Sequence, residues 1–274
     1  MQPLVLKFGG ELLEEASRLA NIASAVRQIG ASTPVAIVHG GGKAIDAALK
    51  AAGIEKRQVE GLRITDEATL DVVVSVIAGL LNTRFVAALT MAGVAAVGLT
   101  GADAACGLSE PAAPHRTVDG RVVDLGRVGI PAPDADVRVL QTLVAGGFVP
   151  VVACIGLGRD GRLFNVNADI FAGHLAARLQ ARRLVIAGTT AGVLTSGGAT
   201  VPELDPAGIA RLMSDGTATS GMMAKLRACE EAVSSGVKDV VIVDGRESLA
   251  LVAAALDDEP RMATRIAANL KSEV

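Results

Sequence analysis

Two glycine-rich segments near the N-terminus carry residues that could bind an anion. Lys7, Gly9 and Gly10 end the apolar run "LVLKFGG", and Gly41 and Gly42 end "VAIVHGGG". Consecutive glycines let main-chain N–H groups approach a ligand closely, and a helix that starts there adds partial positive charge. Either segment alone could be only a tight turn between a strand and a helix. Two such turns, one with a lysine, favour an anion site, most often a phosphate site.

A third polar segment, "NVNAD", holds Asn165, Asn167 and Asp169 at alternate positions before an expected helix. In an extended chain, alternate residues point to the same side, so two amides and a carboxylate could line one wall of a site. The alternative is an asparagine that caps the helix and an aspartate that favours its first turn. Both interpretations remain open from the sequence.

Two further cations and one histidine are candidates for ligand contact. Arg63, in "GLRIT", could bind a carboxylate through two parallel hydrogen bonds, although a solvated arginine is the commoner case. Lys225 lies early in an expected helix, where it opposes the helix dipole unless a polyphosphate binds there or the side chain reaches solvent. His39 lies beside the second glycine segment and could contact a ligand, but a structural role is the commoner one.

These residues must be positioned by a sheet, because short β-branched runs alternate with Ala- and Leu-rich segments of helical period. The pattern predicts an α/β fold with a mainly parallel sheet covered by helices on both faces, whose ligands bind at the carboxyl ends of the strands. The expected strands are residues 4–8, 35–39, 95–99, 148–155, 183–188 and 239–244. The expected helices are residues 13–29, 43–52, 66–92, 134–146, 167–181, 206–214, 221–235 and 247–256.

Several local patterns refine this interpretation. Thr65 is a suitable N-cap for the helix over 66–92. The Gly- and Pro-rich residues 100–133 predict a small β-hairpin at the edge of the main sheet, with a "DG" turn. "GLGRDG" at 156–161 matches a dinucleotide fingerprint only formally, because no helix follows, and we expect a hairpin turn there. The Walker pattern fails around Lys43, since it lacks the first glycine and the Ser or Thr.

Composition excludes several classes of protein. The 274 residues carry a net charge of -3, contain no Trp or Tyr, and hold no long basic run, which argues against a nucleic-acid or anionic-membrane partner. The three cysteines lack metal-ligand spacing and fit a reducing cytosol. We find no signal peptide and expect no spanning helix. A soluble cytoplasmic protein with a small-molecule partner fits these observations.

The segments "KFGG", "VHGGG", "GLRIT", "NVNAD" and "SGMMAKLRACEEAVSSGV" occur in the order seen in the amino acid kinase family. The resemblance covers nearly the whole chain and is strongest to the acetylglutamate branch. It implies an open three-layer αβα sandwich with two lobes, in which residues 1–178 bind the amino-acid substrate and form a homodimer. Residues 179–274 would bind the nucleotide. The implied reaction transfers the γ-phosphoryl of MgATP to the side-chain carboxylate of N-acetyl-L-glutamate, a step of arginine biosynthesis.

The resemblance also implies a role for each candidate. A carboxylate is ionised at neutral pH, so the reaction needs charge stabilisation rather than a general base. Lys7 and Lys225 would supply that charge from opposite sides, with Asp169 holding both. The remaining implied contacts are Gly9 and Gly10 to nucleotide phosphates, Gly41 and Gly42 to the reacting end of the substrate, Arg63 to its α-carboxylate, and Asn165 and Asn167 to its acetamido part. Mg²⁺ would be held mainly by ATP and water.

Two features set this sequence apart from relatives. "TTAGVL" places Thr190 where relatives carry an acid, so nucleotide binding is the less certain half of the site. Only three residues precede the first strand, whereas arginine-inhibited relatives begin with an additional helix, so we expect an arginine-insensitive dimer. The alternatives are a sister kinase for another carboxylate, such as an aminoadipate derivative or a differently acylated glutamate, and a non-catalytic regulatory homologue.

Overall fold

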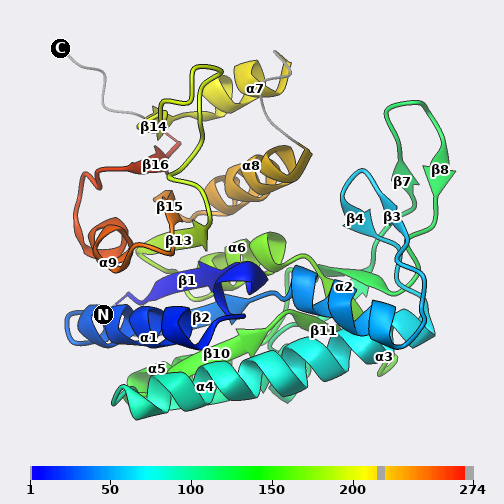
Figure 1. The fold of residues 1–274 in the computed structure, drawn as a ribbon, viewed down its shortest axis with the longest axis horizontal. Helices are drawn as coiled ribbons and strands as arrows, with labels where there is room; N and C mark the ends of the chain where they lie inside the picture. The colour runs from blue at the N-terminus through cyan, green and yellow to red at the C-terminus, as the bar shows by residue number, and fades with distance from the viewer. Residues whose placement is uncertain (1, 215–219, 269–274) are drawn as a thin grey trace.

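The structure, a computed structural model, describes residues 2–214 and 220–268. Its centre is one large sheet. The strands of this sheet are β1 (Leu4–Phe8), β2 (Val35–His39), β5 (Ala96–Thr100), β10 (Val149–Ala153), β13 (Arg183–Gly188), β14 (Glu203–Leu204), β15 (Val240–Asp244) and β16 (Ala263–Ile266). They lie in the order β14-β16-β15-β13-β1-β2-β10-β5 (Figure 1). The six neighbouring strands from β15 to β5 run parallel to one another, and only β16 and β14 run in the opposite direction.

Helices cover both faces of the sheet, which confirms the predicted three-layer αβα architecture with a mainly parallel sheet. The helices are α1 (Ala16–Gly30), α2 (Gly42–Ala51), α3 (Glu67–Val74), α4 (Asn82–Met91), α5 (Arg138–Ala145), α6 (Ala168–Arg178), α7 (Pro206–Ser214), α8 (Ser220–Ser234) and α9 (Ser248–Leu256). Helices α1, α4 and α9 bury apolar side chains on one face, and α2, α3, α5, α6, α7 and α8 do so on the other. The short turns η1 (Gly10–Leu12) and η3 (Asp103–Ala105) are 3-10 helices.

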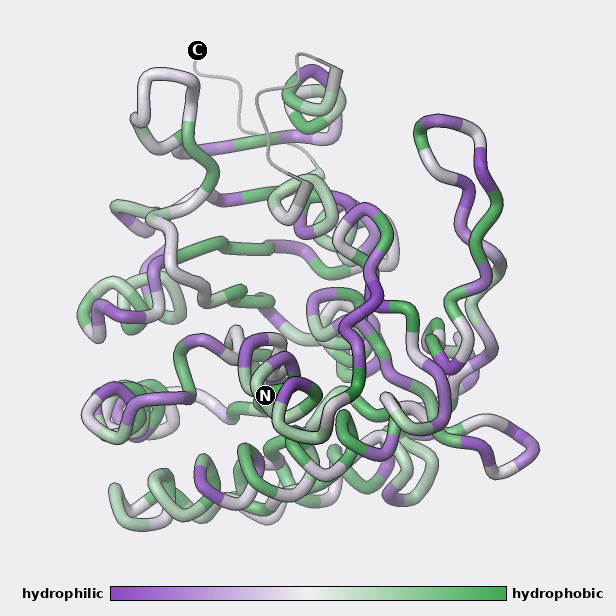
Figure 2. The backbone as a smooth tube through the Cα atoms, turned by 45° about the vertical axis from the view of Figure 1, so that its right-hand side comes forward, coloured by the Kyte–Doolittle hydropathy of each residue, from purple (hydrophilic) through white to green (hydrophobic). Residues whose placement is uncertain are grey.

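The hydrophobic core is divided by the sheet rather than by position along the chain. Each face has one cluster of buried residues, and each cluster includes residues before and after position 178. Figure 2 shows hydrophobic stretches along the central strands that separate these two clusters. Strands such as β1, with every residue buried, read as continuous apolar runs because helices cover both of their faces. The division into lobes at 178/179 stays a prediction.

The predicted excursion over 100–133 forms, but not on the edge of the main sheet. A separate sheet in the order β11-β12-β9-β6 is built from β11 (Ile155–Leu157), β12 (Leu163–Val166), β9 (Val128–Pro131) and β6 (Ser109–Pro111). The expected "DG" turn joins β7 (His115–Arg116) to β8 (Val122–Val123). The 156–161 segment is the predicted hairpin turn, since β11 and β12 pair antiparallel across it. The strand expected over 148–155 therefore ends early and its chain enters the second sheet.

The long helix expected over 66–92 is observed as α3, the π-helical segment η2 (Ser75–Leu81) and α4. This helix is long and apolar enough to cross a membrane, but the core helices of globular proteins often have the same length and composition. Here its buried face packs on the sheet and on α1. The N-cap prediction was wrong by one residue: Asp66 caps the helix by accepting a hydrogen bond from the N–H of Thr69 at 2.9 Å. Thr65 is instead fully buried, and its hydroxyl donates a hydrogen bond to the carbonyl of Arg63.

Candidate active site

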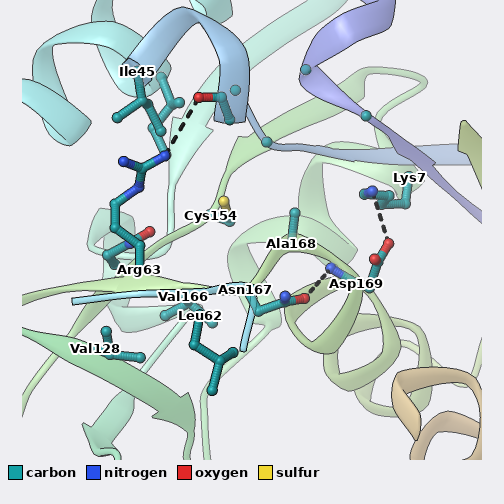
Figure 3. Close-up of a pocket in the computed structure, with 18 of the residues that line it drawn as sticks. Lys7, Ile45, Leu62, Arg63, Val128, Cys154, Val166, Asn167, Ala168 and Asp169 are labelled. Atoms are coloured by element: carbon teal, nitrogen blue, oxygen red, sulfur yellow. Dashed lines mark hydrogen bonds and ion pairs between the residues drawn. The ribbon is translucent and has the colours of Figure 1, made fainter. Parts of the chain in front are cut away.

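A cavity of about 280 Å³ opens at the carboxyl ends of β1 and β2 (Figure 3). Parallel strands bring these ends to one edge of the sheet, which is where open α/β sheets bind their ligands. Nine of the ten residues to which the resemblance assigns a role line this cavity: Lys7, Gly9, Gly10, Gly41, Gly42, Arg63, Asn165, Asn167 and Asp169. The tenth, Lys225, reaches Asp169 from α8. His39, the other candidate for ligand contact, does not line the cavity. The structure thus brings together segments that lie more than two hundred residues apart.

Asp169 lies between two lysines. Its Oδ1 is 2.8 Å from the Nζ of Lys7, the last residue but one of β1, and its Oδ2 is 3.2 Å from the Nζ of Lys225. All three side chains are largely buried, with 8%, 14% and 16% of Lys7, Asp169 and Lys225 exposed. The cluster has a formal charge of +1, since two cations share one carboxylate. A buried excess of positive charge suits an anionic ligand.

The electrostatics of the cluster keep its charges in place. Burial alone would raise the pKa of the Asp169 carboxyl, but Lys7 and Lys225 hold that pKa well below its usual range. Burial would lower the pKa of Lys7, but the attraction and hydrogen bond of Asp169 raise it above its usual value. Burial and the repulsion of Lys7 lower the pKa of Lys225. Lys225 is therefore the cation whose charge depends most on what surrounds it.

The two glycine turns pack backbone against backbone. A Cβ on Gly10 would lie 2.3 Å from the Cα of Gly41, and a Cβ on Gly41 would lie 2.5 Å from Cγ2 of Ile77 and 2.6 Å from Cδ1 of Leu81. Distances below 3.0 Å essentially never occur for real Cβ atoms, so position 10, which meets main-chain atoms, needs glycine, whereas a Cβ at position 41 would force the side chains of Ile77 and Leu81 to shift. Part of the glycine pattern is therefore steric: it lets η1, the loop before α2 and segment η2 meet at one point.

The role expected for the amide of Gly9 needs correction. Its N–H donates a hydrogen bond to the carbonyl of Ala187 at 3.1 Å, which continues the pairing of β1 with β13. While that bond holds, this N–H is not available to a phosphate oxygen. The next two amides, those of Gly10 and Glu11, start the 3-10 turn η1 and are the better candidates, because the first N–H groups of a helical turn have no partner within it.

Arg63 ends strand β4 (Leu62–Arg63), which pairs with β3 (Gln58–Val59) in a hairpin beside the cavity. Its guanidinium forms an ion pair with Asp46 of α2, and its Nη2 is 3.5 Å from the carbonyl oxygen of Gly42. Only 10% of the Arg63 side chain is exposed, and its Nη1 is buried without a hydrogen-bond partner. A buried donor without a partner costs free energy, so a ligand that supplies an acceptor here would be stabilised.

The hairpin that carries Arg63 is held from outside by the hairpin β7–β8. Glu60, at the tip of the first hairpin, accepts hydrogen bonds from the N–H of Val118 at 2.8 Å and from Nε2 of His115 at 2.8 Å. Figure 1 shows the two hairpins projecting side by side from the same end of the molecule. The excursion over 100–133 therefore supports the wall of the cavity that contains Arg63.

The asparagines differ in what they do. Asn167 caps α6, since its Oδ1 accepts hydrogen bonds from the N–H groups of Asp169 at 2.9 Å and Ile170 at 3.2 Å, so the capping interpretation is confirmed for its oxygen. Its Nδ2 remains a candidate for ligand contact at the cavity wall. Asn165 lies on β12 and donates from Nδ2 to the hydroxyl of Thr65 at 3.2 Å. That hydroxyl in turn donates to the carbonyl of Arg63, so the three residues form one chain of hydrogen bonds.

Sequence reasoning missed four residues of the site. Asp46 orients Arg63 and lies one turn into the helix after the second glycine segment. Glu11 and Cys154 line the cavity, and burial raises the pKa of the Cys154 thiol to about 12, so it stays protonated. Thr65 was assigned to a cap. None of these four carries a local pattern that distinguishes it from an ordinary surface or core residue.

Thr190, the departure from the pattern of relatives, lies exposed after β13. The neighbouring Arg246 forms an ion pair with Asp244, whose oxygen lies 2.6 Å from its Nη2, and donates to the carbonyl of Thr189 at 3.0 Å. These contacts join the carboxyl ends of β13 and β15. The cavity described above does not include this region, so the predicted nucleotide contacts stay predictions.

The donor set of the cavity fits a divalent metal that arrives with its ligand rather than a resident one. Within residues 2–214 and 220–268, no group of three or more His, Cys, Asp or Glu residues could hold a metal ion. Both oxygens of Asp169 are engaged by lysines, which leaves Glu11 as the other carboxylate of the cavity. Mg²⁺ commonly binds through substrate phosphates, water and one or two carboxylates.

Comparison with known proteins agrees with this geometry. A family model described as the amino acid kinase family matches residues 2–244. The chain is 41% identical over 252 residues to the acetylglutamate kinase of Acidiphilium cryptum, covering 89% of this chain and 83% of that protein. It is 40% identical over 254 residues to the acetylglutamate kinase of Novosphingobium aromaticivorans, covering 88% and 83%.

Solved structures show the same fold at lower identity. The N-acetylglutamate synthase from Neisseria gonorrhoeae, complexed with coenzyme A and N-acetyl-glutamate, superposes with a TM-score of 0.82 at 24% identity. The match covers 98% of this chain and 60% of that longer one. The carbamate kinase from Giardia lamblia bound to AMP-PNP superposes with a TM-score of 0.68 at 18% identity, covering 98% and 99%. By its family match, its relatives and its fold, the chain belongs to the amino acid kinase family.

Proposed function

We propose that this protein is an acetylglutamate kinase, which transfers the γ-phosphoryl of MgATP to the side-chain carboxylate of N-acetyl-L-glutamate. The products would be N-acetylglutamyl 5-phosphate and ADP, a step of arginine biosynthesis. The observation that carries the proposal is the buried pair of lysines held by Asp169 at the edge of the cavity. The relatives named acetylglutamate kinase, at about 40% identity over most of the chain, support the same substrate.

The chemistry needs cations more than it needs a base. The acceptor carboxylate is ionised at neutral pH, so one of its oxygens attacks the γ-phosphorus directly. The new oxygen–phosphorus bond forms as the bond from that phosphorus to the β,γ-bridging oxygen breaks, and ADP leaves with that electron pair. Lys7 and Lys225 would stabilise the charge on the transferring group, and Asp169 would keep their ammonium groups apart and in place.

The rest of the cavity would orient the acceptor. Arg63 has an unpaired buried donor, Nη1, that suits the α-carboxylate of an amino-acid derivative. Gly41 and Gly42 start α2, whose N-terminal amides suit the oxygens of the reacting end. The amides of Gly10 and Glu11 would face the nucleotide phosphates. When bound, Mg²⁺ would neutralise part of the phosphate charge.

We further propose a homodimer formed by the N-terminal part of the chain, in a soluble cytoplasmic enzyme. The long helix leaves apolar side chains outside, among them Leu80 and Met91, with 46% and 86% exposed. Strand β5 is the last strand of the main sheet and is only half-buried. A second copy could cover both features, because exposed sheet edges favour pairing. Sedimentation should give a dimer mass, and Leu80→Lys together with Met91→Lys should give a monomer.

An acyl-phosphate assay tests the proposed activity. Hydroxylamine traps the acyl phosphate as a hydroxamate, and a panel of N-acetylglutamate, free glutamate, N-acetylaminoadipate and longer N-acylglutamates identifies the acceptor. We expect the highest kcat/KM with N-acetylglutamate and, for Lys7→Ala, a kcat lower by roughly 10²–10³-fold, as for loss of one oxyanion donor. Lys43→Ala is the matched control, since Lys43 is exposed and does not line the cavity.

Each alternative has its own outcome in this assay. Activity with another acid and none with N-acetylglutamate would replace our substrate by that acid. Binding of N-acetylglutamate without hydroxamate formation would favour a regulatory protein. A Lys7→Ala variant as active as the wild type would remove Lys7 from the mechanism.

A further inference from the structure

A buried polar pair lies directly beneath the second glycine turn. His39 is the last residue of β2 and is fully buried, and Asn82, the first residue of α4, is 5% exposed. The Nδ1 of His39 is 3.1 Å from the carbonyl oxygen of Gly40, and its Nε2 is 3.0 Å from Nδ2 of Asn82. The same Nδ2 lies 2.9 Å from the carbonyl oxygen of Val151 on β10.

These contacts fix the tautomer of His39. A carbonyl oxygen only accepts, so Nδ1 must carry the hydrogen and donate to Gly40. In the neutral imidazole Nε2 is then an acceptor, and it receives one of the two hydrogens on Nδ2 of Asn82. The second hydrogen goes to the carbonyl of Val151. With the imidazole neutral, every side-chain donor of His39 and Asn82 therefore has an acceptor. Burial supports this neutral state because it lowers the pKa of His39 to about 4.

The hydrogen bond to Gly40 determines where the next amide points. In a trans peptide the C=O and the following N–H point in opposite directions, and all peptides of the described chain are trans. The carbonyl of Gly40 is turned toward the buried imidazole, so the N–H of Gly41 is turned away from it. Gly41 lines the cavity, and its φ and ψ of -169° and 33° lie outside the helical and strand regions, so its peptide is held by contacts rather than by regular structure.

The long helix holds the same turn from the other side. The side chains of Ile77 and Leu81, in segment η2, occupy the space that a Cβ on Gly41 would need, and Asn82 follows Leu81 in the chain. Phe85, one turn further, packs edge-on against the ring of His39, with ring centroids 6.2 Å apart. The imidazole is thus fixed both by hydrogen bonds and by packing.

We propose that His39 and Asn82 are positioning residues for phosphoryl transfer: the neutral imidazole, held by Asn82, turns the peptide between Gly40 and Gly41 so that the Gly41 N–H faces the transferred group. This inference rests on the proposed kinase activity. His39 does not touch the reacting atoms and transfers no proton. It affects the reaction by holding the Gly41 N–H in one direction.

Two substitutions of His39 separate positioning from packing. In His39→Asn, Nδ2 occupies the place of the imidazole Nδ1 and still donates to Gly40. In His39→Leu, a methyl group occupies that place and donates nothing. Both lose the contact with Asn82 and much of the ring packing, so both should lose stability. We expect His39→Leu to lower kcat by roughly 10²-fold, as for loss of one oxyanion donor, with the KM for MgATP within threefold. His39→Asn should recover at least tenfold of that loss.

A double-substitution cycle tests the link to Asn82. Asn82→Leu should lower kcat less than His39→Leu does, and its combination with His39→Leu should lower kcat little further, because both act through the hydrogen bond from His39 to the carbonyl of Gly40. Equal kcat values for folded His39→Leu and His39→Asn, whether high or low, would overturn the proposal. So would full additivity of the two leucine variants.

A spectroscopic readout keeps the test independent of the substrate. With ¹⁵N-glycine labelling, the amide signal of Gly41 should shift in His39→Leu and return toward the wild-type position in His39→Asn. If the wild type phosphorylates a different carboxylate, the kinetic comparison is run on that acceptor, and only the proposed substrate fails. An unshifted Gly41 signal in His39→Leu would refute the positioning role even if the kinase activity is confirmed.

Discussion

Replacement of Asp169 by asparagine is the sharpest perturbation of this site. The two ion pairs, at 2.8 Å and 3.2 Å, would each be worth about 5–6 kcal/mol at an effective dielectric constant of about 20, before the cost of burying the charges. Removing one partner of a buried pair typically costs about 3–5 kcal/mol of stability. In Asp169→Asn two buried ammonium groups would face each other without a carboxylate. Loss of a proton from Lys225 would remove this repulsion at the lowest cost in free energy.

Deprotonation of Lys225 in this variant predicts how its activity will depend on pH. The pKa of Lys225 is already lowered by burial and by Lys7, and without Asp169 it loses the attraction that opposes these effects. The variant should therefore have a kcat reduced by roughly 10²–10³-fold near neutral pH, as for loss of one charged donor. Because lower pH returns the proton to Lys225, kcat should rise more between about pH 9 and pH 6 in the variant than in the wild type.

The matched control is Asp239→Asn at the other end of the sheet. Asp239 also lies between two cations, with oxygens 2.7 Å from Nε of Arg183 and 3.0 Å from Nε of Arg265. It precedes β15, at the amino ends of the strands, away from the cavity. Urea unfolding should show a loss of stability in both variants, whereas only Asp169→Asn should lose kcat per folded molecule. The reasoning fails if the folded Asp169 variant keeps kcat within threefold of the wild type, or if its pH profile matches the wild type.

Three further predictions concern other parts of the site. Gly10→Ala should abolish measurable hydroxamate formation, since its Cβ would lie 2.3 Å from the Cα of Gly41, whereas Gly30→Ala, with no atom within 4 Å, should be silent in the same assay. Arg63→Lys should raise the KM for the acceptor by at least tenfold and leave the KM for MgATP unchanged, because lysine keeps the charge but lacks the two parallel N–H donors of the guanidinium. Equal changes in both KM values would contradict this role. His39 has a folded-state pKa of about 4 against 6.5 when unfolded, so protonation favours the unfolded chain, and stability present above pH 6.5 is lost as the pH falls toward 4. Urea unfolding at pH 7 and pH 5 should show that His39→Asn removes about 2 kcal/mol of that loss, and an unchanged difference would show that His39 is not buried neutral.

The sheet and its covering helices could be predicted because their signals are local and strong. Strands 4–8, 35–39 and 183–188 were predicted with their observed bounds, since each is a run of apolar residues buried on both faces. The second sheet was not foreseen. Its strands are three or four residues long, and three of the four contain Gly or Pro, so their pairing depends on tertiary contacts that the sequence does not display.

The site was predictable where a residue type stands out in its segment. A lysine at the end of an apolar strand and an Asn-x-Asn-x-Asp run both attract attention, and the resemblance joined them to Lys225. The partners that orient them were not predictable, because Asp46 and Asn82 lie on ordinary helical turns and contact Arg63 and His39, which are 17 and 43 positions away in the sequence. The amide of Gly9 shows the opposite error: the glycine pattern suggested a free donor, whereas the sheet uses it.

The π-helical segment η2 sets the helix register that brings Asn82 to His39. A π turn holds about one residue more than an α turn, so winding residues 75–81 as regular α-helix at the same chain length would turn everything beyond them by about 100°. Asn82 would then leave His39, although the apolar residues and the length of the segment would not change. Deleting one residue between 75 and 81 would instead allow a regular α-helix that keeps the later residues in place. The π turn is therefore the feature that aligns one helix with both the sheet and the glycine turn.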